Sequence, residues 1–420
     1  MRAGLGIKLD DMKHQNLNKS IFLFDQARKI IPSGCSTLAK SPLRLYSGYS
    51  PFYAESAKGS SFIDIDGNKW LDCEMAMGTI VWGYVRNEIS QSIINQLSKG
   101  VSFSIPGKLE FEVAEKILNR IGKYKTLRFC KNGGDAVTAA VRLAKSKTNR
   151  QIVLYGAYHG WHDWAAYRYY GSKTALGISK YTAKDTLWVQ ELSTAHIERL
   201  IRGKERSVAC IVVSPGNWTT SDLQGLQQLC RKYSIALIFD EVATFIRAGK
   251  KGFTGEKDIW PDLLCFSKGL ANGLPLAVIT GKEKYMKRIE DIKLSNTHSS
   301  ELLALAAANV CEDLLIESSI WPSWKNMGIE IINFIRAYIK SSGLENILLI
   351  DGYYGCFRIH TPNNTIQTDP FREFFVKRLA QNGIFSTGYI LLSDQHSCDD
   401  ISQIKLSITQ AIDFWKSKNS

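Results

Sequence analysis

Short apolar runs alternate with helical patterns between residues 127 and 281, and this alternation limits the possible folds more than any other feature of the sequence. The runs are rich in β-branched residues and end at turn-forming or charged residues, as buried strands do. Strands that alternate with helices form layered structures with a mostly parallel sheet. We therefore predict an α/β fold whose strands include LRFCKNGG (127–134), IVLYG (152–156), ACIVVSP (209–215), IALIFDEV (235–242), LLCFS (263–267) and LAVITG (276–281).

Two segments between these runs have helical character. DAVTAAVRLAK (135–145) is rich in alanine, which has the highest helix propensity. In SDLQGLQQLCRKYS (221–234) we expect Ser221 to be the N-cap, because a serine side chain can accept a hydrogen bond from the first turn. The apolar residues of this second segment recur at helical spacing and share one face, which holds Leu223, Leu226, Leu229, Cys230 and Tyr233.

The two ends of the chain have a different pattern. The first 60 residues hold one amphipathic segment, SIFLFDQARKII (20–31), and then a loop rich in Pro, Ser and Gly. After residue 312 the helical patterns are longer, and the run ILLIDGYYGCFRIH (347–360) is typical of strands. We expect a large domain and a smaller α+β domain built from both termini, with the divisions 1–60, 61–312 and 313–420.

The composition indicates a globular protein of a reducing compartment. With 420 residues, of which 45% are hydrophobic, the chain can bury a large core. Its nine cysteines are odd in number and scattered, without a CxxC motif or a Cys/His cluster, so neither a disulfide framework nor a zinc site is expected. Because no run approaches the roughly 18 apolar residues of a membrane helix, we expect a cytoplasmic protein without a membrane partner.

The net charge of +13 has three explanations. A basic protein can bind nucleic acid, but the lysines and arginines are spread along the chain without a dense cluster and interleaved aromatic residues, so a nucleic-acid partner is not expected. A basic balance also attracts anionic small molecules such as phosphates and carboxylates. A solvated basic surface without a ligand accounts for the charge equally well.

Chemically useful residues follow the predicted strands at the ends where open α/β sheets bind ligands. Asp240 and Glu241 close the run IALIF, and a buried carboxylate there needs a cationic partner. Lys268 follows the next predicted strand, and Gly133 with Gly134 forms a strand-to-helix turn whose backbone N–H groups can approach a phosphate. A phosphate cradle, an acid and a lysine together are what pyridoxal phosphate requires. Each feature alone has an ordinary explanation: a charged strand terminus, an exposed lysine or a plain turn.

The ordered motifs resemble those of the class III, fold-type I, pyridoxal phosphate-dependent aminotransferases, and most of all the glutamate-1-semialdehyde aminomutase branch. The similarity extends from about residue 30 to 312 and continues more loosely to the C-terminus. It implies a large domain with a mostly parallel seven-stranded sheet flanked by helices, a smaller α+β domain and a homodimer. The motifs that carry it are SAKGSSFIDIDGNKWLD (56–72), RFCKNGGDAVTAAVRLAK (128–145), YHGWHD (158–163), LIFDEVATFIR (237–247) and PDLLCFSKGLANGLPLAVITG (261–281).

The resemblance assigns roles to residues around the cofactor ring. Lys268 matches the family's Schiff-base lysine, and Asp240 matches the acid paired with the pyridine nitrogen. Tyr158 matches the aromatic residue that stacks on one face of the ring, and Val242 matches the apolar residue on the other. His159, next to Tyr158, is also expected to be a cofactor-binding residue. Tyr158 and Val242 have an ordinary alternative as core residues. His159 and His162 could suggest a metal pair, but no third ligand at a suitable spacing is evident, so we expect no metal.

The resemblance also assigns residues around the phosphate. Asn132, Gly133 and Gly134 lie where the family has Ser-Gly-Thr, so the hydroxyl groups are missing and backbone amides with the Asn132 side chain would have to bind the phosphate. Thr297 matches the threonine that reaches the phosphate of the neighbouring subunit, which implies an active site shared within a dimer. Its alternative role is to cap the helix that follows.

The substrate residues differ from those of the aminomutases. SPLR (41–44) resembles the aminomutase segment that holds a substrate carboxylate, which makes Ser41 and Arg44 candidates, with a loop arginine in a surface ion pair as the alternative. Met77, the third candidate substrate residue, stands where that branch has a tryptophan. Ser214 stands where the family has a glutamate, and FSTGYILLS (385–393) lacks the glutamate that the aminomutases have there.

These departures favour amino transfer between two substrates over an intramolecular aminomutase reaction, which is the second interpretation. KNGGDAVTAAVRLAK, YHGWHDW and SKGLANGLP resemble family members of surface-sugar and secondary-metabolite pathways. The expected partners are therefore an amino donor such as glutamate and a carbonyl acceptor such as an oxidised sugar in carbohydrate biosynthesis. A third interpretation is a protein that binds the cofactor or a sugar nucleotide without catalysis, although such a protein need retain neither Lys268 nor Asp240.

Overall fold

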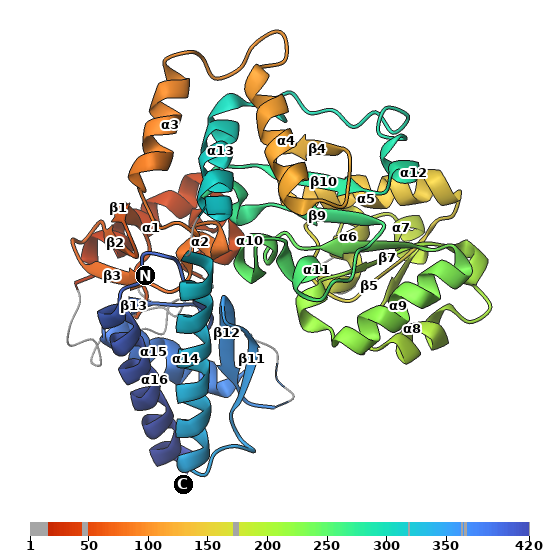
Figure 1. Cartoon of the computed structure of the whole chain (residues 1–420). Helices are drawn as coiled ribbons and strands as arrows, with labels where there is room; N and C mark the ends of the chain where they lie inside the picture. Colours follow the sequence, from red (N-terminus) through yellow and green to blue (C-terminus); the bar gives the residue numbers. More distant parts are fainter. Residues whose placement is uncertain are drawn as a thin grey trace. The chain divides into compact units, whose positions relative to one another are not determined.

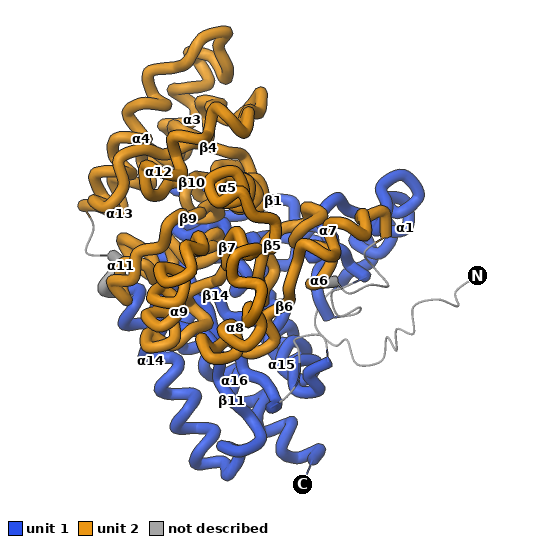
Figure 2. The backbone as a smooth tube through the Cα atoms, turned by 90° about the vertical axis from the view of Figure 1, so that its right-hand side faces the viewer, with its two compact units in different colours: residues 1–86, 322–420 blue, residues 87–321 orange. Residues whose placement is uncertain are grey.

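The computed structural model describes residues 16–43, 49–170, 176–317, 320–362, 364 and 368–419, without the side chains at 170 and 320–323. The chain divides into two compact units (Figure 2). Unit 1 combines residues 1–86 with 322–420, and unit 2 spans residues 87–321. The domain boundaries at 60 and 312 that the sequence suggested stay predictions.

Unit 2 is built on a seven-stranded sheet with the order β4-β10-β9-β8-β7-β5-β6 (Figure 1). β10 runs antiparallel to both of its neighbours, and all other pairs are parallel. The strands are β4 (Leu127–Cys130), β5 (Ile152–Tyr155), β6 (Thr186–Trp188), β7 (Val208–Val213), β8 (Ala236–Asp240), β9 (Leu263–Phe266) and β10 (Ala277–Gly281). The prediction of a mostly parallel seven-stranded sheet is confirmed, and all six strands expected from the apolar runs are present.

Helices cover this sheet, and α5 packs against its central strands. Small side chains let α5 approach closely, because Ala136, Ala140 and Ala144 are fully buried in the same core as Cys210, Ala236 and Cys265. The helices of unit 2 are α3 (Asn87–Leu97), α4 (Lys108–Ile121), α5 (Gly133–Thr148), α6 (Asp163–Tyr170), α7 (Lys180–Lys184), α8 (Thr194–Ile201), α9 (Thr220–Tyr233), α10 (Phe245–Ala248), α11 (Gly252–Glu256), α12 (Glu283–Met286) and α13 (Leu302–Glu317), with short 3-10 helices η4 (Glu205–Ser207), η5 (Pro215–Asn217) and η6 (Lys268–Ala271).

The N-cap of α9 corrects a sequence prediction. Thr219, not Ser221, caps this helix, and its hydroxyl accepts a hydrogen bond from the Asp222 N–H. Ser221 lies within the first turn, where its hydroxyl is 3.1 Å from the Thr219 hydroxyl. The apolar face of α9 is as expected, since it buries Leu223, Leu226, Leu229 and Cys230.

Unit 1 contains two smaller sheets. The first has the order β1-β2-β3-β13, and the second has the order β11-β12-β14. Trp70 is fully buried against Phe62 in the first sheet, and its indole N–H donates to Asp64. The elements are α1 (Asn18–Ile30), β1 (Ala54–Lys58), β2 (Ser61–Asp64), β3 (Lys69–Asp72), α2 (Met75–Gly78), α14 (Ile320–Ser341), β11 (Leu349–Tyr353), β12 (Cys356–His360), α15 (Pro370–Gln381), β13 (Ile384–Phe385), β14 (Ile390–Leu391) and α16 (Cys398–Asn419), with 3-10 helices η2 (Pro32–Gly34) and η3 (Leu38–Lys40).

All nine cysteines are free thiols. Within the described ranges, none of the helices combines the length and the apolar character needed to span a membrane.

Candidate active site

Six of the seven strands described in the large sheet of unit 2 end along the same edge, and five of them are followed by candidate site residues. β5, β7, β8 and β9 are parallel neighbours, and β4 shares their direction because both β4 and β9 are antiparallel to β10. Segments that leave parallel strands at their carboxyl ends converge above that edge, where open α/β sheets bind ligands. The residues that follow these strands are Asn132 to Gly134 after β4, Tyr158 and His159 after β5, Ser214 after β7, Asp240 to Val242 at the end of β8 and Lys268 after β9.

Asp240 is buried and held at both carboxylate oxygens. His159 Nδ1 lies 2.6 Å from Asp240 Oδ2, and the backbone N–H of Val242 donates to Oδ1 over 3.0 Å. The His159 ring is itself fixed, because it stacks on Trp164 with an interplanar angle of 13° and meets the edge of Tyr155. These contacts define one orientation of the Asp240 carboxylate.

Glu241 has a structural role that the sequence did not assign. Its carboxylate accepts hydrogen bonds from the Thr254 N–H and hydroxyl at Oε1 and from the Phe253 N–H at Oε2. Burial raises the pKa of Glu241, and these hydrogen bonds oppose the shift. The acid therefore ties the start of α11 to the end of β8, while its neighbour Asp240 faces His159.

Lys268 begins η6 directly after β9 and is half-buried. Its φ of 46° lies in the left-handed region, which costs a non-glycine residue roughly 1–2 kcal/mol. The preceding Ser267 fixes the turn, because its hydroxyl donates to the Leu276 carbonyl over 2.7 Å. Since Cys265 pairs with Asp240 in the β8–β9 register, Lys268 and Asp240 leave adjacent strands at the same edge.

α5 begins with two glycines, Gly133 and Gly134, and the lack of a side chain at Gly133 has a steric reason. A Cβ atom on Gly133 would lie 2.4 Å from Val242 Cγ1, and one on Gly160 would lie 3.0 Å from the Gly134 Cα. Bare backbone therefore faces the segment after β5 and the end of β8. The N–H groups of Asp135 and Ala136 donate to the Asn132 carbonyl, so the candidate donors to an anion at this helix start are the N–H groups of Gly133 and Gly134.

Asn132 is tied to the same turn by Asp135. The Asn132 N–H donates to Asp135 Oδ2 over 3.0 Å, and its side-chain amide donates to the same oxygen over 3.1 Å. His162 Nε2 lies 3.5 Å from Asp135 Oδ1. The predicted phosphate role of Asn132 stays a prediction, because its amide hydrogen bond here stabilises the turn itself.

The predicted stacking residue, Tyr158, is exposed to 51% and contacts the edge of Tyr169. Val242 is partly buried and packs on the core of unit 2. Thr297 is exposed in a turn before α13, so it does not directly precede that helix. None of their predicted cofactor contacts is tested by these observations.

The predicted substrate residues belong to unit 1. The Ser41 hydroxyl is buried and donates to the Ser33 carbonyl over 2.7 Å, and Arg44 lies outside the described residues. Met77 is exposed to 36% and has a φ of 60° in a left-handed turn that runs from Met75 to Gly78. Their substrate roles stay predictions.

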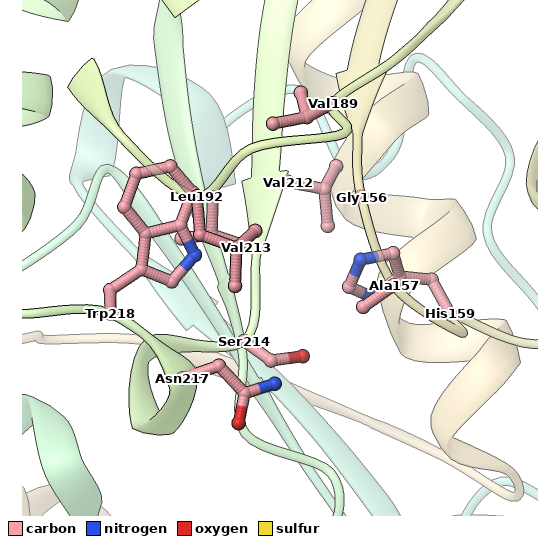
Figure 3. A pocket seen from close by; sticks show the side chains of 10 residues that line it. All are labelled: Gly156, Ala157, His159, Val189, Leu192, Val212, Val213, Ser214, Asn217 and Trp218. Carbon is pink, nitrogen blue, oxygen red and sulfur yellow. The ribbon is translucent and has the colours of Figure 1, made fainter. Parts of the chain in front are cut away.

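Two polar contacts of the site were missed by sequence reasoning. His159 meets Asp240 across 81 positions, and Ser214 lines a cavity with His159 (Figure 3). The available signal was that both follow predicted strands at the same edge as Asp240. Across the described part of the chain, no group of three or more His, Cys, Asp and Glu side chains is arranged to hold a metal ion.

Comparison with known proteins gives consistent matches. A family model described as "Aminotransferase class-III" matches residues 46–385. A glutamate-1-semialdehyde 2,1-aminomutase from Methanosphaera stadtmanae is 29% identical over 424 residues, which cover 94% of this chain and 98% of the relative. The enzyme of the same name from Methanococcus maripaludis is 31% identical over 299 residues, which cover 68% and 67% of the two chains.

Solved structures agree on the fold. The FumI protein of Sphingopyxis sp. MTA144, in its PLP internal aldimine form, has a TM-score of 0.85 at 20% identity, and the match covers 94% of this chain and 96% of that one. The predicted fold-type I architecture is confirmed.

Proposed function

Since this chain belongs to the class III aminotransferase family, we propose that it is a pyridoxal phosphate-dependent aminotransferase. It moves an amino group from an amino-acid donor such as glutamate to a carbonyl acceptor, and the acceptor class is a sugar-derived or other keto intermediate of a biosynthetic pathway. The observation that carries the proposal is the convergence of Asp240, Lys268 and the bare first turn of α5 at one sheet edge.

The residues at this edge fit the cofactor. The first turn of α5 offers backbone N–H donors for its phosphate, and a side chain at Gly133 is excluded by Val242. Asp240 is a buried carboxylate already oriented by His159, which suits it to pair with a protonated pyridine nitrogen. Lys268 supplies an amine at the same edge. When bound, pyridoxal phosphate supplies an electron sink for the carbanion that forms at the donor's Cα.

The chain's own residues perform the proton transfers. The Asp240 carboxylate keeps a proton on the pyridine nitrogen, and the His159 contact prevents the carboxylate from rotating away. With the cofactor bound, the Lys268 Nζ would be the base that takes the proton from the donor's Cα and the acid that gives it back during the transfer. Release of the donor as a keto acid would consume one water molecule, and the same Nζ would serve the reverse proton transfers with the carbonyl acceptor.

A spectrum followed by a panel of amino donors tests this function. We expect the purified protein, with pyridoxal phosphate added, to show the visible band of a lysine-bound cofactor, and L-glutamate alone to convert it to the pyridoxamine form. Lys268→Ala should abolish the band while leaving the far-ultraviolet circular dichroism unchanged. Cofactor binding without conversion by any donor would favour the non-catalytic interpretation.

The intramolecular aminomutase is the second candidate. The relatives reported above carry that name, and one observation in unit 1 favours it. FSTGYILLS lacks an acid of its own, yet the Glu74 carboxylate accepts hydrogen bonds there from the Thr387 N–H over 2.8 Å and the Thr387 hydroxyl over 2.6 Å. Turnover of glutamate-1-semialdehyde without an external amino donor would establish the mutase. Conversion by L-glutamate alone, with no such turnover, would establish the transaminase.

We propose further that the active site is shared in a homodimer. The family resemblance places Thr297 at the phosphate of the neighbouring subunit, and its exposure leaves it accessible to a second copy. Ser41, Arg44 and Met77 are the proposed substrate contacts. Their individual alanine variants should raise the KM for one substrate more than they lower kcat.

A further inference from the structure

A small cavity lies beside His159 at the carboxyl ends of β5 and β7 (Figure 3). Its volume is about 10 Å³, the lower end of the space that one water molecule occupies. The apolar part of the wall includes Val189 and Val212, and the lining residues with polar side-chain atoms are His159, Ser214, Asn217 and Trp218. None of the lining side chains carries a fixed charge, because the lining contains no Asp, Glu, Lys or Arg.

One of these polar groups is an unsatisfied buried atom. His159 is exposed to only 2%, and its Nδ1 is engaged by Asp240. Its Nε2 is buried without a hydrogen-bond partner among the described residues. A buried polar atom without a hydrogen bond lowers the stability of the fold, so we expect Nε2 to have a hydrogen-bond partner within the cavity.

The chemistry of the lining identifies that partner. When Nδ1–H is donated to the Asp240 carboxylate, neutral His159 presents a lone pair at Nε2 and needs a donor there. The cavity has room for one water molecule, which can donate to Nε2 and still bond to the Ser214 hydroxyl. In Figure 3 the Ser214 hydroxyl and the Asn217 side-chain nitrogen point toward the side of the cavity on which the His159 ring lies.

We propose that the cavity binds one ordered water molecule between His159 Nε2 and the Ser214 hydroxyl, and that this water holds His159 in the tautomer protonated at Nδ1. Ser214 is then a positioning residue, which acts on the site through the water, His159 and Asp240. The neutral tautomer leaves the negative charge on Asp240, where a protonated pyridine nitrogen needs it. The role of the Asp240 charge in catalysis rests on the proposed function, whereas the presence of the water and the tautomer of His159 do not.

The serine is a departure from the family pattern, which the resemblance described above gives as a glutamate at the position of Ser214. A carboxylate in this cavity would favour a proton on Nε2. A hydroxyl brings no charge to the cavity and can hydrogen-bond to the proposed water. The residue at position 214 therefore affects where protons lie on the His159–Asp240 pair, although both residues of the pair are unchanged.

The test combines crystallography with ¹⁵N NMR of histidine side chains in the full-length protein purified with its cofactor, and His159→Gln assigns the resonance. We expect an ordered water within hydrogen-bond distance of Nε2 and the Ser214 hydroxyl, with Nδ1 protonated and Nε2 not. Ser214→Ala should lose the water and shift the Nε2 resonance, Ser214→Thr should preserve both, and Ser214→Asp should protonate both nitrogens. Ser207→Ala, at the other end of β7, is the matched control and should change nothing.

A binding measurement gives an independent readout. Loss of one neutral hydrogen bond in the network should raise the dissociation constant for pyridoxal phosphate about three- to tenfold in Ser214→Ala. A wild-type protein with Nε2 protonated, or a cavity without ordered water at high resolution, would overturn the proposal. So would a Ser214→Ala variant with an unchanged Nε2 resonance and unchanged affinity. If no amino donor supports transamination, the proposed function fails, but the crystallographic water and the NMR tautomer still test this inference.

Discussion

At the residue scale, the Asp240 carboxylate has one oxygen at His159 and the other at the Val242 N–H, and these two contacts fix its orientation. Preorganised charges of this kind contribute to catalysis because they need not rearrange during the reaction. The chain achieves this by placing Asp240 at the end of a fully buried strand, with His159 after a strand two places away in the sheet.

Asp240→Asn should therefore lower kcat/KM about 10²- to 10⁴-fold, because a neutral amide cannot hold a proton on the pyridine nitrogen. Steady-state kinetics with the best amino donor measure the effect, and circular dichroism checks the fold. Asp313→Asn removes an acid that pairs with Lys116 at the surface, and this control should retain activity. Activity within threefold of wild type in Asp240→Asn would contradict the assigned role.

Glu74 gives a residue-scale prediction about pH. Burial raises the pKa of Glu74 from 4.5 to about 7, despite the opposing hydrogen bonds from Thr387. The folded state thus binds the proton more tightly than the unfolded state, so the contribution to stability is full below about pH 4.5 and is lost as the pH rises through about 7. Glu74→Gln should remove this loss and increase the free energy of unfolding at pH 8 by about 1–3 kcal/mol.

Denaturant unfolding at pH 5 and pH 8 measures this difference. Glu55→Gln, an exposed glutamate of the same unit, serves as the control and should follow the wild-type profile. Parallel pH profiles for wild type and Glu74→Gln would show that Glu74 does not titrate in this window.

At the element scale, the first turn of α5 depends on Gly133. A Cβ there would lie 2.4 Å from Val242 Cγ1, so Gly133→Ala should lower the free energy of unfolding by about 1–3 kcal/mol and weaken pyridoxal phosphate binding. Adding Val242→Ala removes the clashing methyl groups and should restore part of both losses. Denaturant unfolding and a fluorescence titration with the cofactor are measured for the wild type, the two single variants and the double variant. Strictly additive losses of stability and cofactor affinity would exclude the steric explanation.

Elements with a strong local signal were predictable from sequence. The buried strands β7, β8 and β9 are continuous apolar runs, and the alanine-rich pattern of α5 fixes both its type and its buried face. β6 was missed because it has three residues and pairs only with β5. The cap of α9 was misplaced because Thr219 and Ser221 both suit an N-cap, and local sequence does not show where η5 ends.

Site residues that directly follow a strand could be predicted from the sequence, whereas side-chain contacts between distant positions could not. Strand-end position was enough to place Asp240, Lys268 and Gly133 at one edge. The contact of His159 with Asp240 joins positions 81 apart, and local sequence contains no signal for such pairing. The hydrogen bond from the Asn132 side-chain amide to the Asp135 carboxylate likewise depends on side-chain geometry within a turn, which local sequence does not show.

At the scale of the whole molecule, we expect a homodimer. Unit 2 exposes large apolar side chains on one segment before and within α4, with Phe103 at 51%, Ile105 at 75% and Phe111 at 65%. Exposed apolar residues of this size are often covered by a protein partner, and a second copy also accounts for the expected position of Thr297. Sedimentation equilibrium should give twice the chain mass of 47.2 kDa. A monomer at micromolar concentration would contradict the shared site.

We propose that pyridoxal phosphate binds covalently to Lys268 at the edge formed by β4, β8 and β9. Borohydride reduction of the cofactor-loaded protein, followed by peptide mass spectrometry, detects this bond. We expect a phosphopyridoxyl group on Lys268 at near-stoichiometric yield. A label on a different lysine, or none at all, would contradict it.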